Sequence, residues 1–388
     1  MPENLLGVDK MKRLLTAIIF ALTFATSNVQ AATSEPHVTA TSAILVEAST
    51  GRILYEKNAN EELPPASMTK MLTCVIALEK LNPNAEVFVT PEAMSAEDNT
   101  LRWEPLDSLA AKDMVTAVML VSENGGAIAL AQTTAGSVAQ FADMMNDKAR
   151  ELGCKHSNFV NPNGLPDTRH YSSATDMARI AVYCMKNPDF RKIVETRRTS
   201  IHWLYPKDKW SELNNTNELL GKFKGANGIK TGWTNAAGGC LASSAKRGDI
   251  ELIAVVMRST DMDTRFDDAS KLLTYGFERV RMVEAVDAER IDKKVFVRGG
   301  KQATVRVGVD ENLMFPLMAG EDSKLLTVTY DMPKIVEAGF DEGQVLGEVV
   351  LRYDGKPVAR VPLVAREGVA EGFSFGSLFV TLFGAFFA

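Results

Sequence analysis

The sequence predicts an α+β protein in which a mixed main domain precedes a small all-β domain. Within residues 91–188, apolar side chains such as Met114 and Val118 recur at helical spacing. After Gly225, three strand-like runs follow one another through short polar turns, which is typical of an antiparallel meander. Beyond residue 283 the apolar runs are strand-like. A chain of 388 residues, 46% of them hydrophobic, is long enough for two to three domains.

The N-terminus has the pattern of a secretory signal peptide. Three basic residues precede an apolar run over residues 14–25, and two small residues, Ala31 and Ala32, follow it. The run is too short to span a bilayer, which favours a cleaved signal over a membrane anchor. We therefore expect residues 1–32 to be removed and the protein to be secreted across the cytoplasmic membrane.

A hairpin is the first predicted element of the main domain. Its strands are the apolar runs at 43–46 and 53–55, on either side of a turn at 49–52. A helix is predicted to follow it, because two prolines at 64–65 fix φ at a helix entry and apolar residues then recur at helical spacing as far as Asn82.

Ser67 and Lys70 stand in the first turn of this predicted helix. Residues three apart lie on one helix face, so Lys70 is expected beside the Ser67 hydroxyl. Serine is a weak nucleophile until a base takes its proton, and a lysine can be that base only if burial or a second cation lowers its pKa. Ser67 is thus a candidate nucleophile. Ser-x-x-Lys alone is a loose pattern that a chain of this length contains roughly once by chance.

A second polar group lies where two predicted helices join. Ser122 could relay a proton, and Asn124 could orient Lys70 or a substrate amide, because both side chains donate and accept hydrogen bonds. The structural alternative for Ser122 is a helix cap. Glu123, between them, is expected to be solvated.

Three strands and a helix are predicted to complete the main domain. The strands occupy residues 229–234, 240–245 and 250–257, and the helix residues 263–279. On the first strand, Lys230 and Thr231 could hold a substrate carboxylate. Gly232 would leave room for the backbone of a substrate. The alternative for Lys230 is an ordinary solvent-facing lysine.

Several classes of site are not expected. Neither a Cys-x-x-Cys motif nor a paired histidine spacing occurs, so no metal and no other cofactor is predicted. The four cysteines lie in apolar stretches and are predicted to be buried free thiols. The formal net charge is −6, and no basic cluster with interleaved aromatic residues is present, which argues against nucleic acid as a partner.

The order of the three motifs is that of penicillin-binding proteins and serine β-lactamases: Ser-x-x-Lys at Ser67, Ser-x-Asn at Ser122 and Lys-Thr-Gly at Lys230. Longer stretches resemble the D-alanyl-D-alanine carboxypeptidase family, namely residues 43–51, 65–73, 159–167 and 228–232. The resemblance covers residues 42–277, and an all-β domain after them also matches the family's layout.

The resemblance implies a penicillin-recognising, β-lactamase-like fold, in which an antiparallel sheet is flanked by helices and a helical lobe is inserted around Ser122. The expected domains are a serine D,D-peptidase domain at 33–282 and an all-β domain at 283–368. The implied substrate is a peptidoglycan stem peptide ending in D-Ala-D-Ala. β-Lactam antibiotics mimic this bond and would acylate Ser67.

The resemblance also implies a role for each motif residue. Ser67 would attack the carbonyl between the two D-alanines, Lys70 would take its proton, and Ser122 would help pass that proton to the departing D-alanine. The terminal carboxylate would be bound by Lys230 and Thr231. The oxyanion hole would consist of the backbone N–H groups of Ser67 and Trp233.

Two features depart from the family pattern or limit the activity. Gly125 and Gly126 follow the Ser-x-Asn motif, which puts the rigidity of that turn in doubt. The loop at 158–171 contains no glutamate that could activate a deacylating water, which disfavours efficient β-lactam hydrolysis. Transpeptidation at the same site stays open, since it differs only in the acceptor. A non-catalytic wall-binding module would need a broken site.

The C-terminal segment at 369–388 is predicted to anchor the protein to the outer face of the cytoplasmic membrane. Its last 16 residues carry no charge and would form about 24 Å of helix, short of the roughly 30 Å hydrocarbon core. A stripe of small and polar residues includes Ser374 and Ser377, and the phenylalanines lie away from it. We expect residues 371–388 to contain an amphipathic helix in the membrane interface. A short tilted span, or packing on another protein, is the alternative.

Overall fold

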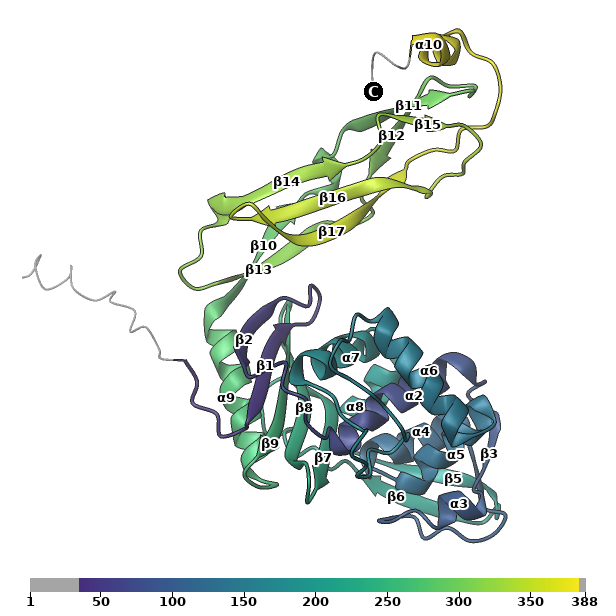
Figure 1. Ribbon diagram of the computed structural model, residues 1–388, viewed down its shortest axis with the longest axis vertical. Coiled ribbons are helices and arrows are strands. Elements are labelled where there is room, and N and C mark those ends of the chain that lie inside the picture. The colour runs from purple at the N-terminus through teal and green to yellow at the C-terminus, as the bar shows by residue number, and fades with distance from the viewer. Residues whose placement is uncertain (1–34, 384–388) are drawn as a thin grey trace, which may run out of the picture. The chain divides into compact units, whose positions relative to one another are not determined.

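The computed structural model describes residues 35–383, so the predicted signal peptide at 1–32 lies outside the described residues. A five-stranded antiparallel sheet, in the order β2-β1-β9-β8-β7, forms the centre of the main domain (Figure 1). The predicted hairpin and the three-stranded meander are confirmed. The strands are β1 (Ser42–Glu47), β2 (Ile53–Lys57), β7 (Ala226–Thr234), β8 (Gly238–Arg247) and β9 (Ile250–Ser259).

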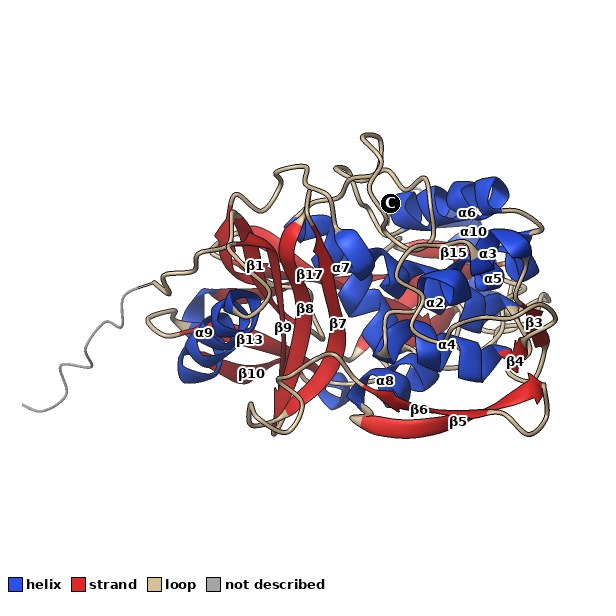
Figure 2. Ribbon diagram, turned by 90° about the horizontal axis from the view of Figure 1, so that it is seen from below, coloured by secondary structure: helices blue, strands red, loops and turns tan. Residues whose placement is uncertain are grey.

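Side chains alternate along these strands and give the sheet two apolar faces. Ile44 and Val46 of β1 belong to one core, while Leu45 belongs to the other. Figure 2 shows α9 (Thr264–Arg279) on one side of the sheet. On the opposite side lie α2 (Lys70–Lys80), α7 (Ala174–Lys186) and α8 (Pro188–Glu195), together with the helical lobe.

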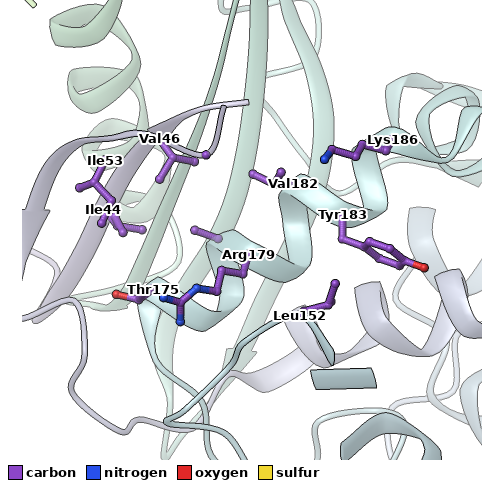
Figure 3. A pocket seen from close by; sticks show the side chains of 11 residues that line it. Ile44, Val46, Ile53, Leu152, Thr175, Arg179, Val182, Tyr183 and Lys186 are labelled. Carbon is purple, nitrogen blue, oxygen red and sulfur yellow. The ribbon is translucent and has the colours of Figure 1, made fainter. Parts of the chain in front are cut away.

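A hollow of about 250 Å³ lies between the β1–β2 hairpin and α7 (Figure 3). Ile44, Val46 and Ile53 face it from the hairpin, and Val182 faces it from the helix. None of the residues predicted for catalysis or substrate binding lines it. It therefore belongs to the packing of the hairpin on α7 rather than to the predicted site.

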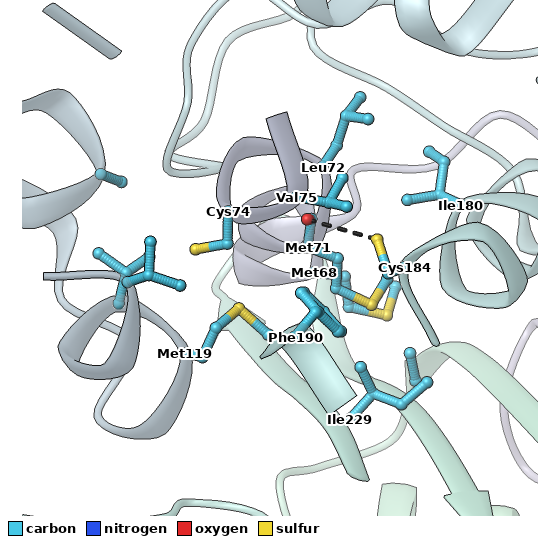
Figure 4. Close-up of a cluster of buried hydrophobic side chains, with 14 of the residues drawn as sticks. Met68, Met71, Leu72, Cys74, Val75, Met119, Ile180, Cys184, Phe190 and Ile229 are labelled. Carbon is cyan, nitrogen blue, oxygen red and sulfur yellow. Dashed lines mark hydrogen bonds between the residues drawn. The ribbon is translucent and has the colours of Figure 1, made fainter. Parts of the chain in front are cut away.

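Helix α2 is buried on every side over residues 70–77. Met71 and Val75 pack among Met68, Ile180 and Phe190 (Figure 4). The thiols lie in the same surroundings: all four cysteines are free and three are buried, as predicted, while Cys154 is half-buried. A charged or polar side chain on this helix is therefore removed from water and needs hydrogen-bond partners.

A helical lobe is inserted between α2 and α7, as predicted. Its helices are α3 (Pro91–Met94), α4 (Ala111–Leu120), α5 (Asn124–Ala135) and α6 (Val138–Glu151). It also carries a four-stranded sheet that was not predicted. The strands of this sheet are β3 (Glu86–Phe88), β4 (Ser108–Ala110), β5 (Arg198–Tyr205) and β6 (Trp210–Asn214). Two of them have only three residues, too few to show a period.

Gly125 and Gly126, whose place after the Ser-x-Asn motif put the rigidity of the turn in doubt, are closely packed. A Cβ atom on Gly125 would lie 2.4 Å from the carbonyl oxygen of Ala93 in α3. A Cβ atom on Gly126 would lie 2.9 Å from a methyl group of Val118 in α4. The two glycines therefore allow α5 to approach both helices closely.

The C-terminal part is all β, as predicted, apart from short helical segments. It contains a six-stranded sheet, in the order β14-β16-β17-β12-β11-β15, and a separate two-stranded sheet, β10–β13. Asp354 and Gly355 form a tight hairpin turn, with φ of 48° and 74° and Tyr353 paired to Lys356. The predicted boundary at 282/283 falls inside β10. The strands are β10 (Val280–Val286), β11 (Lys293–Arg298), β12 (Thr304–Gly308), β13 (Leu313–Met318), β14 (Leu326–Asp331), β15 (Ile335–Glu337), β16 (Val345–Tyr353) and β17 (Lys356–Ala365).

Helix α10 (Phe375–Phe383) ends the described chain, and residues 384–388 of the predicted anchor lie outside it. Its small, polar stripe packs inward: Ser377 is 3% exposed, and Ser374 Oγ donates to the carbonyl of Gly300 at 3.1 Å. Its large side chains point outward, with Phe375 85% and Leu382 65% exposed. Within residues 35–383 we find no helix with the length and apolar character needed to cross a membrane.

Candidate active site

One hollow of about 460 Å³ brings together residues of all three motifs. The predicted site residues that line it are Ser67, Ser122, Asn124, Thr231, Gly232 and Trp233. Lys70 and Lys230 do not line it, because they are 0% and 1% exposed. The two lysines thus lie within the protein next to the hollow rather than on its surface.

Ser67 lies in a 3₁₀ turn, η1 (Ala66–Thr69), rather than in the first turn of an α-helix as predicted. The loop at 158–171 presses on this turn, and a Cβ atom on Gly164 would lie 1.9 Å from the carbonyl oxygen of Ala66. Ala66 itself has a φ of 49°. The close contact with the loop accounts for the tighter turn, and the half-buried Ser67 hydroxyl still borders the hollow.

The amine of Lys70 reaches three oxygen atoms. It lies 2.8 Å from Ser67 Oγ, 2.6 Å from Asn124 Oδ1 and 2.8 Å from the carbonyl oxygen of Asn163. A protonated amine can donate to all three. A neutral amine has two protons for Asn124 and Asn163 and one lone pair left for the hydroxyl proton of Ser67. The predicted pairing of Lys70 with Ser67 is therefore present.

Burial is the main reason why the pKa of Lys70 lies well below its ordinary value, and the positive charge of Lys230 is the second. Burial likewise lowers the pKa of Lys230 to about 7, with Arg265 adding to the effect. The sequence suggested a second cation as a cause of a neutral Lys70. The structure ranks burial first, because α2 is enclosed on all sides.

The loop at 158–171 makes contacts with Lys70 and with the turn that carries Ser67, which the sequence did not indicate. Its Asn163 carbonyl accepts from Lys70, and a hydrogen bond of 2.8 Å between Thr69 Oγ1 and His170 Nε2 joins the loop to the turn that carries Ser67. The N–H of Val160 donates to His170 Nδ1, so Nε2 carries the proton, and burial lowers the pKa of His170 to about 4. A neutral histidine thus fastens this loop beside Lys70.

Ser122 lies between α4 and α5, as predicted, with a φ of 62°. It is not the cap of α5, since the residue before that helix is Glu123 and no side chain caps it. Ser122 instead borders the hollow. The catalytic alternative is thus compatible with its position, and the helix-cap alternative is not.

Glu123 was expected to be solvated, and this was wrong: it is 0% exposed. Its carboxylate accepts hydrogen bonds from the N–H groups of Thr100 and Leu101, at 2.8 and 3.0 Å, and from Trp103 Nε1 at 2.8 Å. Burial raises the pKa of Glu123, and these donors lower it. The carboxylate therefore fastens the loop at 97–103 against the helical lobe.

Gly232 lies close to the turn that carries Ser67. A Cβ atom on it would lie 3.1 Å from Ser67 N and 3.2 Å from the carbonyl oxygen of Pro65. The glycine therefore allows β7 to approach this turn closely, and its role toward a substrate backbone stays a prediction. Lys230 is not solvent-facing: it is buried, and its amine donates to the carbonyl of Thr231 at 3.0 Å.

Arg265 is a cleft residue that the sequence did not reveal. It lies on α9, is 8% exposed and lines the hollow, and its Nη1 donates to the carbonyl of Gly232 at 2.7 Å. Thr231 Oγ1, beside it on β7, is 2.7 Å from Thr216 Oγ1. A cation and a hydroxyl therefore border the same wall of the hollow, which suits a carboxylate.

Comparison with known proteins agrees with this geometry. Residues 29–261 match the family model described as D-alanyl-D-alanine carboxypeptidase, and residues 277–371 match the penicillin-binding protein 5 C-terminal domain. The D-alanyl-D-alanine carboxypeptidase DacF of Bacillus subtilis is 35% identical over 373 residues, 93% of this chain and 95% of that protein. The chain belongs to the D-alanyl-D-alanine carboxypeptidase family.

Further relatives support the same assignment. DacC of Escherichia coli is 30% identical over 88% of this chain and 87% of its own. The crystal structure of penicillin-binding protein 5 from Haemophilus influenzae matches with a TM-score of 0.71 and 28% identity, over 87% of this carboxypeptidase and 99% of that chain. The predicted penicillin-recognising fold and serine hydrolase class are thus confirmed. The enzyme is a serine-type D-Ala-D-Ala carboxypeptidase that acts on peptidoglycan, and β-lactam binding is typical of its family.

Proposed function

We propose that Ser67 is the nucleophile of this carboxypeptidase and Lys70 its general base. The observation that carries the proposal is the environment of the Lys70 amine, which is enclosed by protein and reaches Ser67 Oγ, Asn124 Oδ1 and the Asn163 carbonyl. The two fixed acceptors take the two protons of the neutral amine. Its lone pair is then directed at the Ser67 hydroxyl, which loses its proton as Oγ attacks the carbonyl between the two D-alanines.

The remaining residues stabilise charge and move the proton. The N–H groups of Ser67 and Trp233 bind the oxyanion, and each such donor contributes a factor of roughly 10²–10³ in rate. Ser122 passes the proton from Lys70 to the nitrogen of the departing D-alanine. Thr231 and Arg265 contact the terminal carboxylate, while buried Lys230 adds positive potential behind them. Water then hydrolyses the acyl-enzyme, and β-lactams acylate the same serine.

Release of D-alanine tests these roles. Wild type should release D-alanine from diacetyl-L-Lys-D-Ala-D-Ala, and Ser67→Ala should lose this release while keeping its melting temperature. Ser95→Ala, which changes an exposed serine in the same way, should retain it. Release by Ser67→Ala at the wild-type rate would refute the assignment of the nucleophile.

Helix α10 supports a second proposal, peripheral attachment to the outer face of the cytoplasmic membrane through residues 371–388. Phe375 and Leu382 expose their side chains to solvent, while the polar stripe of the helix packs on the protein. Family members are periplasmic cell-wall enzymes, so such an anchor would hold the enzyme beside its substrate. Deletion of 371–388 should move the protein to the soluble fraction. Retention in the membrane fraction would refute the anchor.

A further inference from the structure

Two carboxylates border the catalytic hollow in addition to the motif residues. Glu97 and Asp98 lie in the loop between α3 and β4, line the same hollow as Ser67, and are exposed. Within residues 35–383, neither carboxylate has a hydrogen-bond or ion-pair partner in the structure. Asp98 is also near enough to raise the pKa of Lys70, against the larger lowering effect of burial. Unpaired carboxylates at the mouth of a catalytic cleft are available to a cationic ligand.

This loop is held in place by residues 123–125, which begin α5 beside the proposed catalytic residues. The side chain of Asn124 donates from Nδ2 to the carbonyl of Glu97 at 2.7 Å, while its Oδ1 accepts from Lys70. Asn99 Oδ1 accepts from the N–H of Gly125 at 2.7 Å. Glu123 binds the next two N–H groups of the loop. The backbone that carries the two carboxylates is therefore held in place before any ligand binds.

A positive group faces the same hollow from another element. Arg265 on α9 is more than nine-tenths buried, lines the hollow, and its Nε has no hydrogen-bond partner among the described residues. The hollow thus combines a cation suited to a terminal carboxylate with a separate anionic pair. A ligand that matches both has a negative C-terminus and a positive side chain nearer its N-terminus.

We propose that Glu97 and Asp98 make the enzyme prefer stem peptides in which the residue before D-Ala-D-Ala carries a free ammonium group. The inference rests on the proposed function, since it concerns the substrate of the same cleft. Acylation of that amine, as in a cross-linked or blocked peptide, removes the charge. Exposed ion pairs are individually weak, so we expect a combined preference of about 3- to 10-fold in kcat/KM.

Two peptides that differ only in this charge provide the test: Nα-acetyl-L-Lys-D-Ala-D-Ala and its Nα,Nε-diacetyl form. Wild type should prefer the free amine at low ionic strength, and the preference should shrink in 0.5 M salt, where the Debye length falls to a few ångströms (about 4 Å). In the double variant Glu97→Gln/Asp98→Asn the ratio of the two kcat/KM values should fall to about 1. Glu104→Gln, an exposed glutamate of the same loop that does not line the hollow, should keep the wild-type ratio.

The outcomes separate this inference from the proposed function. A wild-type ratio of 1, or a preference that survives in the double variant, would overturn it. An equal loss on both peptides with the ratio retained would also overturn it, because the carboxylates would then act on a chemical step. Labelling by fluorescent penicillin, which has no such side chain, shows that each variant is folded. No release from either peptide by wild type would instead refute the proposed function.

Discussion

The side chain of Asn124 holds Lys70 through a hydrogen bond of 2.6 Å from the lysine amine to Oδ1. Its other end donates to the carbonyl of Glu97, so one amide connects the proposed general base to the loop that borders the cleft. The orientation of the amide is set by these two partners, because a lysine can only donate and a carbonyl can only accept. The charge state of Lys70 and the position of the loop therefore depend on the same residue.

Asn124→Asp should slow acylation at neutral pH. The substitution keeps the shape of the side chain but places a negative charge 2.6 Å from the Lys70 amine, and an adjacent opposite charge raises a lysine pKa by about 1–3 units. At a pH below the pKa of Lys70, each unit by which that pKa rises lowers the fraction of neutral amine roughly tenfold. The rate of labelling by fluorescent penicillin is measured as a function of pH. In the variant, the increase of this rate with pH should occur at higher pH than in wild type. Asn84→Asp, on the exposed surface, is the control.

Lys230→Gln should also move the acylation profile to higher pH. The charge of Lys230 lowers the pKa of Lys70, and removing it raises that pKa, so the neutral base forms only at higher pH. Because burial is the larger cause, the shift should be partial. Stopped-flow acylation by a chromogenic β-lactam gives the profile, with exposed Lys224→Gln as the control. A shift to lower pH would contradict the proposed coupling between the two lysines.

Glu123→Ala should destabilise the protein although it lies in a short loop. The substitution leaves the N–H groups of Thr100 and Leu101 and the indole N–H of Trp103 without their acceptor. We expect the free energy of unfolding to fall by about 2–4 kcal/mol. Chemical denaturation measures this, and exposed Glu104→Ala should change stability by less than about 0.5 kcal/mol. Equal effects of the two variants would be inconsistent with the buried role of Glu123.

Gly164→Ala should impair acylation, and Gly153→Ala should not. Both glycines have positive φ, 83° and 76°, so both variants should lose about 1–2 kcal/mol of stability from backbone strain. Only at Gly164 would the new Cβ collide with the turn that carries Ser67, since nothing lies within 4 Å of the position at Gly153. The rate of penicillin labelling separates the two. Equal labelling rates would show that contact with this loop does not position the nucleophile.

The sequence predicted those residues of the proposed site that belong to short motifs. Ser67, Ser122 and Lys230 each stand at a place where local periodicity predicts a helix start, a helix junction or a strand, and these elements formed. Arg265 carries no local signal, because its position in the cleft depends on tertiary packing that brings its side chain from α9 to the carbonyl of Gly232 on β7. Glu123 was misjudged for a related reason, since a carboxylate in a loop is normally solvated and only tertiary packing buries it.

The strands of the helical lobe were not predicted, and the reason is also physical. β3 and β4 are too short to show alternation, and β5 has only two buried residues, Ile201 and Trp203. Strands β1 and β9 of the central sheet were predictable because they are packed on both faces and therefore consist of long apolar runs. Burial on both sides gives a strong sequence pattern, and marginal burial gives a weak one.

The most direct test of the account is to map the site of β-lactam attachment by mass spectrometry. Wild type incubated with penicillin and digested should carry the added mass on the peptide that contains Ser67. Ser67→Ala should carry none, and Ser122→Ala should acquire it more slowly on the same peptide. An adduct on the peptide that contains Ser122, or an adduct that persists in Ser67→Ala, would contradict the assignment of Ser67 as the nucleophile.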